Sequence, residues 1–165
     1  MARVAILTAS DSSSAGARDD ASGPAVARRC REAGHEVVET LVVPDDIAAI
    51  SEALVRWCDG SLADVVITTG GTGLTPRDVT PEATRAVAER DVPALPVALA
   101  VEGLKKTPYA ALTRGIAVTR GKTLIINLPG SPKAVEEGMD VLLPLLDHVA
   151  ELLAGPVEHG GPAPR

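Results

Sequence analysis

Residues 64–73 read DVVITTGGTG, and this stretch decides the fold of the 165-residue chain. Its first half is a short apolar run rich in β-branched side chains, which is typical of a buried strand. Its second half is a glycine-rich loop, in which the backbone can come close to a ligand. Two similar apolar runs, residues 3–9 and 36–43, lie upstream. The sequence therefore predicts three buried strands, one of which ends in a candidate ligand-binding loop.

Helical patterns separate these strands. Residues 22–33 open with Ser-Gly-Pro, and residues 46–58 carry apolar side chains at helical spacing. Strands that alternate with helices favour βαβ units. We therefore expect an α/β fold with a mostly parallel sheet that helices cover on both faces.

A further helix is expected after the glycine-rich loop. It should begin at Thr80, a good N-cap, with Pro81 at the first helical position, and run to about Arg90. Residues 93–115 contain three prolines and show mixed periodicity. They predict short helices only.

The remaining sequence predicts a hairpin and a last helix. Residues 116–128 contain two β-rich runs around Arg120 and Gly121, so they should add an antiparallel element to the sheet. A long helix should begin near Ser131, with one apolar face committed to the core. Pro144 lies off that apolar face and should merely bend the helix.

Composition limits the function classes. Hydrophobic residues make up 45% of the chain but aromatic residues only 1%, and the formal net charge is -6. Few stacking platforms and a negative charge argue against nucleic-acid binding. The N-terminal apolar run is too short to span a membrane, and the two cysteines form no CxxC pair, which favours a reduced, cytoplasmic protein. We expect one domain, residues 1–154, and a disordered tail, residues 155–165.

Four polar or glycine-rich loops each follow a predicted strand and lead into a helix. They contain Ser10 and Asp11, residues 44–46, residues 68–78 and residues 128–133. Ligands of open α/β sheets bind outside the carboxyl ends of the strands. The four loops therefore predict a single crevice.

Two of the loops are candidate anion sites. Residues 68–73 offer backbone N–H groups and threonine hydroxyls, but match neither a P-loop nor a dinucleotide fingerprint. The turn at Gly130 and Ser131 presents a helix N-terminus, which favours phosphate. The alternatives are an unliganded glycine-rich turn and a serine that only caps its helix.

Asp45 and Asp78 are the candidate catalytic and metal-binding carboxylates. Both lie where a predicted strand passes into a helix, and two carboxylates near phosphates suit Mg²⁺. In a transfer to phosphorus, a metal there would neutralise the charge that builds up on the leaving pyrophosphate. Arg77 and Lys133 could share that role. Asp46 is the expected N-cap of its helix, although the sequence leaves a capping role open for Asp45 as well.

Longer motifs resemble a known family. The runs TTGGTGLTPRDVTPEAT (68–84), VPDD (43–46), NLPGSPKAV (127–135) and SDSSSAGARDDASGP (10–24) resemble the MogA/MoaB family of molybdenum cofactor biosynthesis proteins. The likeness covers residues 3–154. It implies a three-layer α/β/α domain, usually a homotrimer, that binds molybdopterin. In the MogA branch it implies Mg²⁺-dependent transfer of AMP from ATP to molybdopterin, with pyrophosphate released and the product passed on for molybdate insertion by a molybdopterin molybdotransferase.

The resemblance also suggests site residues. Asp45 and Asp78 match the family aspartates associated with catalysis and metal. The substrate-binding positions that it implies, together with those that the loops themselves suggest, are Ser10, Asp11, Asp20, Thr69, Gly70, Gly71, Thr72, Gly73, Gly130, Ser131, Pro132 and Lys133.

The chain departs from the family pattern in its first loop and after Pro93. Ser12 replaces a common basic residue, and Val97 and Ala100 occupy the positions of a common Glu and Arg. The lost Glu and Arg favour a second hypothesis, a MoaB-like protein that binds molybdopterin without adenylylating it. A third hypothesis is a detached copy of the related domain of molybdopterin molybdotransferases. Because Asp45 and Asp78 are intact, the adenylyltransferase remains the first hypothesis.

Overall fold

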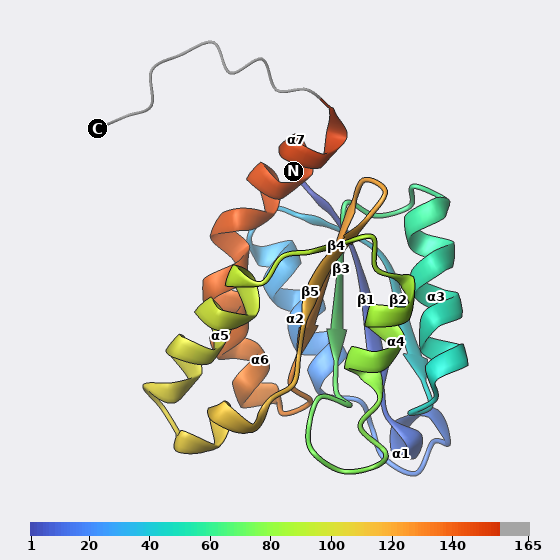
Figure 1. Cartoon of the computed structure of the whole chain (residues 1–165), viewed down its shortest axis with the longest axis vertical. Helices are drawn as coiled ribbons and strands as arrows, with labels where there is room; N and C mark the ends of the chain where they lie inside the picture. Colours follow the sequence, from blue (N-terminus) through green and yellow to red (C-terminus); the bar gives the residue numbers. More distant parts are fainter. Residues whose placement is uncertain (156–165) are drawn as a thin grey trace.

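Six strands form one mixed sheet in the computed structural model, which describes residues 1–155, and their order is β2-β1-β3-β6-β5-β4 (Figure 1). The strands are β1 (Arg3–Ala9), β2 (Glu36–Val43), β3 (Val65–Thr69), β4 (Arg90–Asp91), β5 (Ala117–Arg120) and β6 (Thr123–Leu128). Strands β2, β1, β3 and β6 pair in parallel, whereas β5 is antiparallel to both of its neighbours. The expected α/β fold with an antiparallel hairpin element is therefore confirmed.

Helices cover both faces of the sheet, as expected (Figure 1). Helices α2, α6 and α7 lie on one face, with α5 against α6, and helices α3 and α4 lie on the other. The α-helices are α1 (Asp11–Ser14), α2 (Ser22–Glu32), α3 (Ile47–Asp59), α4 (Thr80–Val87), α5 (Ala94–Leu104), α6 (Pro132–Leu142) and α7 (Leu146–Ala154), and the 3-10 helices are η1 (Pro108–Leu112) and η2 (Leu143–Leu145).

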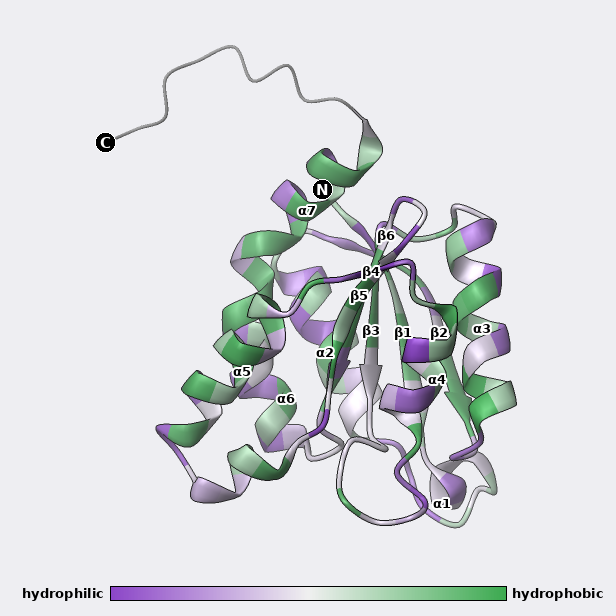
Figure 2. Cartoon of the chain, viewed as in Figure 1, coloured by the Kyte–Doolittle hydropathy of each residue, from purple (hydrophilic) through white to green (hydrophobic). Residues whose placement is uncertain are grey.

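The central strands place apolar side chains in a core cluster on each face of the sheet, as a parallel sheet between two helix layers requires, and their residues are mostly hydrophobic (Figure 2). Ile6 on β1 pairs with Ile67 on β3, which pairs with Ile126 on β6, and none of the three is more than 1% exposed. A separate cluster under α3 and α4 includes the fully buried Trp57. This rigid centre fixes where the strand ends, and therefore the loops, meet.

The sequence predicted the N-cap of one helix correctly and that of another wrongly. Asp46 caps α3 as expected, because its carboxylate accepts a hydrogen bond from the Ala49 amide at 2.8 Å. The expectation for Thr80 is wrong: Val79 is the N-cap of α4, and the Thr80 hydroxyl makes no capping bond. Helix α4 also ends at Val87 rather than near Arg90, because β4 pairs with β5 there.

Prolines account for two further corrections. Residues 93–115, expected as short helices only, contain the 11-residue α5, because Pro96 lies in its first turn, where no intrahelical N–H bond is lost. Pro144 does more than bend the last helix. It lies in η2, which separates α6 from α7.

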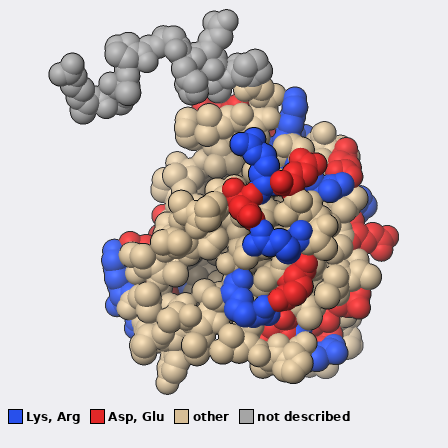
Figure 3. All heavy atoms as spheres, in the orientation of Figure 1, with Lys and Arg blue, Asp and Glu red and all other residues tan. Residues whose placement is uncertain are grey.

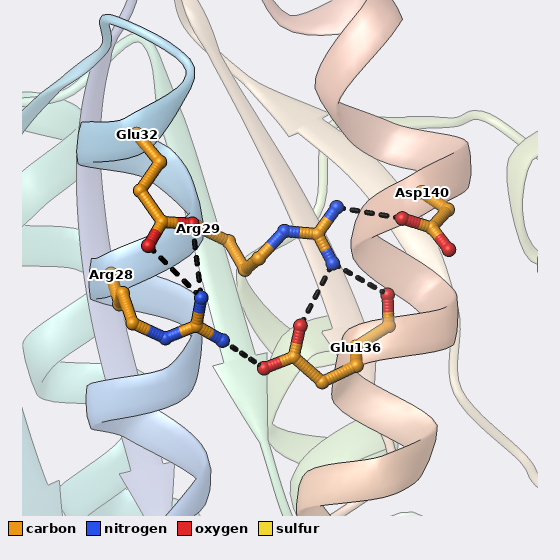
Figure 4. A network of polar contacts seen from close by, with 5 residues as sticks. All are labelled: Arg28, Arg29, Glu32, Glu136 and Asp140. Carbon is orange, nitrogen blue, oxygen red and sulfur yellow. Dashed lines mark hydrogen bonds and ion pairs between the residues drawn. The ribbon is translucent and has the colours of Figure 1, made fainter.

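Ion pairs join α2 to α6 across the surface (Figure 4). Arg29 donates to Glu136 at 2.8 Å and to Asp140 at 2.6 Å, and Arg28 contacts both Glu32 and Glu136. Both helices begin at loops of the predicted crevice. The network therefore braces the two helices that carry those loops.

Two expectations concern the ends of the chain. The predicted disordered tail, residues 155–165, lies outside the described residues apart from Gly155. Among the described residues, no helix has the length and apolar character that crossing a membrane requires.

Candidate functional site

The four predicted loops meet at one edge of the sheet, beyond the carboxyl ends of β1, β2, β3 and β6 (Figure 1). Two cavities open there, of about 490 Å³ and 340 Å³. Gly70, Gly130 and Ser131 line both cavities. The site is therefore a pair of adjoining cavities that share one glycine-rich wall.

The two cavities differ in their outer walls. The larger lies between the glycine-rich loop and the apolar segment α5–η1, whose lining residues include Leu99, Ala100, Tyr109 and Leu112. The smaller is lined by polar residues of the first loop, among them Ser10, Arg18, Asp19, Asp20 and Ser22. The larger cavity therefore offers apolar contacts, which suit a planar ring, and the smaller one offers polar contacts.

Close packing explains the glycines of the shared wall. Gly70 and Gly71 have φ angles of +83° and +66°, and a Cβ on Gly70 would collide with the carbonyl oxygen of Ala9. A Cβ on Gly130 would lie 3.1 Å from the Cα of Gly70. The two glycine-rich loops therefore touch, and only glycine allows both the conformation and the contact.

Several amides of this wall have no protein partner. Within the described residues, the N–H groups of Gly71, Thr72, Gly130 and Ser131 donate no hydrogen bond. Thr72 is buried, and buried amides are rarely left unpaired, whereas water can reach the exposed Gly130 and Ser131. Phosphate oxygens could accept from these amides, as in other anion-binding loops.

Asp45 lies next to the glycine-rich loop and is joined to Asp11 by two hydrogen bonds. The Asp11 amide donates to Asp45 Oδ2 at 3.0 Å, and the Asp45 amide donates to Asp11 Oδ1 at 3.0 Å. Burial raises the pKa of the Asp45 carboxyl above its ordinary value, and the charges of Asp11 and Asp78 act in the same direction. Arg77 forms an ion pair with Asp11 and lowers the pKa of that residue. A cation beside Asp45 would therefore be favoured.

Asp78 lines the larger cavity. Its Oδ2 accepts hydrogen bonds from the amide and the hydroxyl of Thr75, at 2.9 and 2.7 Å. Burial opposes ionisation, but these bonds, an amide contact from Gly73 and the charge of Arg114 together hold the pKa of Asp78 below its ordinary value. Asp78 is therefore an ionised carboxylate at the cavity wall.

The remaining predicted residues fall into three groups. Gly71, Thr72 and Gly73 line the larger cavity, while Ser10, Asp20 and Pro132 line the smaller one. Asp11, Asp45, Thr69 and Lys133 line neither. Thr69 is fully buried and hydrogen-bonded to Ser22 at 2.8 Å. Their roles toward substrate stay predictions.

Two of these side chains also support the fold. Ser131 caps α6 by accepting from the Ala134 amide at 3.2 Å, so the capping interpretation of this serine is confirmed. Asp20 binds the start of α2, accepting from the amides of Ser22 and Gly23, both at 3.1 Å. Neither role excludes contact with a ligand in the adjoining cavity.

The sequence prediction missed the apolar wall and one arginine. Arg114, just before β5, donates to the carbonyl oxygens of Gly73 and Asp78. These contacts join residues 36 and 41 positions apart, so no local pattern marks them. The one available signal is a lone arginine inside the apolar stretch 108–118.

The donor set at the site suits a hard cation. Asp45 and Asp78 supply carboxylate oxygens, the ligand type that Mg²⁺ prefers, and phosphates of a substrate usually complete its coordination. Among the described residues, no group of three or more His, Cys, Asp or Glu side chains could hold a metal by itself. The residues therefore fit a metal that arrives with a phosphorylated substrate.

Comparison with known proteins gives the family. Residues 5–148 match the family described as a probable molybdopterin binding domain. The chain belongs to this family. The resemblance found in the sequence motifs is thus confirmed, and the molybdopterin-binding domain has its place in molybdenum cofactor biosynthesis.

Relatives of this molybdopterin-binding domain differ in length. It is 37% identical over 154 residues to the molybdopterin adenylyltransferase of Helicobacter pylori, covering 92% of this chain and 88% of that protein. It is 42% identical to the molybdenum cofactor synthesis protein cinnamon of Drosophila melanogaster, covering 92% of this chain but 26% of cinnamon. The chain therefore spans about a quarter of the length of cinnamon.

Solved structures agree with the fold. The crystal structure of the molybdopterin biosynthesis enzyme MoaB from Thermus thermophilus superposes with a TM-score of 0.88 at 46% identity, covering 94% of this chain and 98% of that one. At this identity and coverage the likeness extends over nearly the whole length of both chains.

Proposed function

We propose that the protein transfers AMP from ATP to the terminal phosphate of molybdopterin. In this reaction a phosphate oxygen of molybdopterin bonds to the α-phosphorus of ATP, and the bond from that phosphorus to the bridging oxygen breaks, so that pyrophosphate leaves. The observation that carries the proposal is the pair of cavities with a shared glycine-rich wall, next to two intact aspartates. Such an arrangement suits two substrates whose phosphates must meet.

The residues of the shared wall would orient the reacting groups. The unpaired amides of Gly71, Thr72, Gly130 and Ser131 would bind phosphate oxygens where the cavities join. Asp45 and Asp78 would hold Mg²⁺, which when bound neutralises charge on the phosphates and on the leaving pyrophosphate. The apolar wall at α5 and η1 would exclude water from one side of the site.

The alternative is binding without transfer, as in MoaB-like proteins. It is favoured by one observation: Ala100 stands in the wall of the larger cavity where the family commonly has Arg, and Val97 lies beside it, 60% exposed, where the family commonly has Glu. A charge that could contact a substrate is therefore missing from that wall.

The test is adenylate formation from purified protein, molybdopterin, ATP and Mg²⁺. We expect the wild type to form adenylylated molybdopterin, and Asp45→Asn and Asp78→Asn each to lose at least about a hundredfold in rate. Asp46→Asn is the matched control, because it removes the charge next to Asp45 while asparagine still caps α3. Binding of molybdopterin without product would support the MoaB-like alternative. Direct incorporation of molybdate would support the molybdotransferase hypothesis.

We also propose that the protein is a homotrimer whose contacts include the exposed face of α5 and η1. Val97, Val101, Leu104, Tyr109 and Leu112 are each 49–76% exposed, and this surface carries few charged side chains (Figure 3). An apolar patch of this kind is typical of an interface. Sedimentation equilibrium of the wild type and of Val101→Asp tests it.

Hand-off of the product to a molybdopterin molybdotransferase, and a cytoplasmic location, stay predictions.

A further inference from the structure

Arg114 holds both ends of the loop that carries Asp78. Its Nε donates to the carbonyl oxygen of Gly73 at 2.7 Å, and its Nη2 donates to the carbonyl oxygen of Asp78 at 2.6 Å. The Arg114 amide also donates to the carbonyl oxygen of Thr72 at 2.8 Å. One residue therefore binds the backbone on each side of the loop of residues 73–78.

The guanidinium is itself fixed by α4. Its Nη1 donates to the carboxylate of Glu82, in the first turn of that helix. Arginine presents five N–H donors in a rigid planar fork, so one side chain can bind two carbonyls and a carboxylate at once. A lysine has the charge but not this geometry.

The loop has few other internal ties. Thr75 and Asp78 bond to each other, through the Asp78 amide to the Thr75 carbonyl at 3.0 Å and through the Asp78 carboxylate. Leu74 is 65% exposed. The Arg77–Asp11 ion pair also ties the loop to the first loop, but both side chains are exposed. The position of the Thr75–Asp78 turn therefore depends on this exposed pair and on the groups that hold its two ends.

We propose that Arg114 is a positioning residue, which closes the loop of residues 73–78 and so holds Asp78 at the wall of the larger cavity. The expected effect of Arg114 on the reaction rate rests on the proposed function. The expected effect of Arg114 on the position of the loop does not depend on that function. Arg114 does not line either cavity, so it acts through Asp78 and not on substrate.

The chain contains a matched control. Arg120, at the other end of β5, donates to both carboxylate oxygens of Asp59 at 2.8 Å and to the Val87 carbonyl at 3.1 Å. Its side chain is 25% exposed, against 35% for Arg114. The two arginines make similar bonds in similar surroundings, but only one touches the loop.

The experiment compares Arg114→Gln, Arg114→Lys and Arg120→Gln with the wild type. We expect kcat of adenylate formation to fall about tenfold to a hundredfold in Arg114→Gln, with the KM for molybdopterin within about threefold. Arg114→Lys should recover part of the loss, and Arg120→Gln should keep the wild-type kcat. A wild-type kcat in Arg114→Gln, or an equal loss in Arg120→Gln, would overturn the proposal.

A second measurement needs no substrate. Hydrogen exchange at the Asp78 amide should be at least about tenfold faster in Arg114→Gln than in the wild type, and unchanged in Arg120→Gln. If Arg114→Gln does not fold, Arg114→Lys takes its place in both measurements. If the wild type makes no adenylate, the proposed function fails, and exchange alone decides the role of Arg114: unchanged exchange refutes it.

Discussion

The side chain of Thr80 packs directly against Gly71, on the side where any other residue would carry its Cβ. A Cβ at Gly71 would overlap the Thr80 hydroxyl oxygen and lie 3.2 Å from Asp45 Oδ1. The Thr80 amide also donates to the Gly71 carbonyl at 3.1 Å. The start of α4 and Asp45 can therefore pack closely against the glycine-rich loop only because Gly71 has no side chain.

Gly71→Ala tests this contact, with Gly121→Ala as its control. Both glycines have positive φ angles, +66° and +55°, but a Cβ on Gly121 meets nothing within 4 Å. We expect Gly121→Ala to lower the free energy of unfolding by about 1 kcal/mol, the cost of the left-handed conformation. Gly71→Ala should cost at least about 2 kcal/mol more, because the clash adds to that strain. Urea denaturation measures both, and equal losses would show that the packing around Gly71 yields easily.

The Thr80 hydroxyl gives a second prediction. It is fully buried without a hydrogen-bond partner, whereas the equally buried Thr84 hydroxyl accepts from Asn127 at 3.0 Å. We expect Thr84→Val to lower the free energy of unfolding by about 1–2 kcal/mol, because it takes an acceptor from a buried amide. Thr80→Val should change it by less than about 0.5 kcal/mol, because no bond is lost. A loss as large as that of Thr84→Val would mean that the Thr80 hydroxyl has a partner in solution.

Local signals account for the parts of the fold that the sequence predicted. Strands β1, β2 and β3 are β-branched runs, and α3 shows regular apolar spacing behind a good N-cap, so neighbouring residues alone mark them. The meeting of the loops was predictable as well, because the carboxyl ends of parallel strands lie at one edge. Asp78 was found at a cavity wall for this reason.

Tertiary contacts account for the parts that were missed. Strand β4 has two residues and exists because it pairs with β5, so its own sequence carries no signal. Arg114 acts on carbonyl groups distant in sequence, and Thr80 lies inside the first turn of α4, where its hydroxyl packs against Gly71 and does not cap the helix. Such roles depend on the assembled fold and not on spacing.

The ion pairs between α2 and α6 should be unequal in strength (Figure 4). The Arg29 side chain is 20% exposed and binds two carboxylates and a carbonyl, whereas the Arg28 side chain is 52% exposed. We expect Arg29→Gln to lower the free energy of unfolding by about 1 kcal/mol and Arg28→Gln to leave it unchanged within error. Thermal denaturation at low and at high salt measures this. The prediction fails if both variants lose equally, or if neither does.

The Asp64–Arg3 pair predicts a pH dependence of stability. Arg3 donates to Asp64 through its amide at 2.8 Å and through Nη2 at 2.6 Å, and the Asp64 side chain is 23% exposed. Burial opposes ionisation of Asp64, but these bonds outweigh it and hold its pKa below the ordinary 3.8. A depressed pKa stabilises the folded state above the unfolded pKa, and this contribution is lost as the pH falls through the folded pKa.

Asp64→Asn should therefore be less stable than the wild type by about 1 kcal/mol at pH 7, and this difference should shrink as the pH falls below 3.8 and through the lower pKa of the folded state. Asp91→Asn is the control, because that side chain is 60% exposed and its pair with Arg85 lies on the surface. Urea denaturation from pH 7 to pH 3 measures both variants. A difference for Asp64→Asn that does not shrink at all as the pH falls below 3.8 would mean that the loss comes from packing and not from the charge. Asp64 precedes β3 at the end away from the cavities, so adenylate formation at pH 7 should be unaffected.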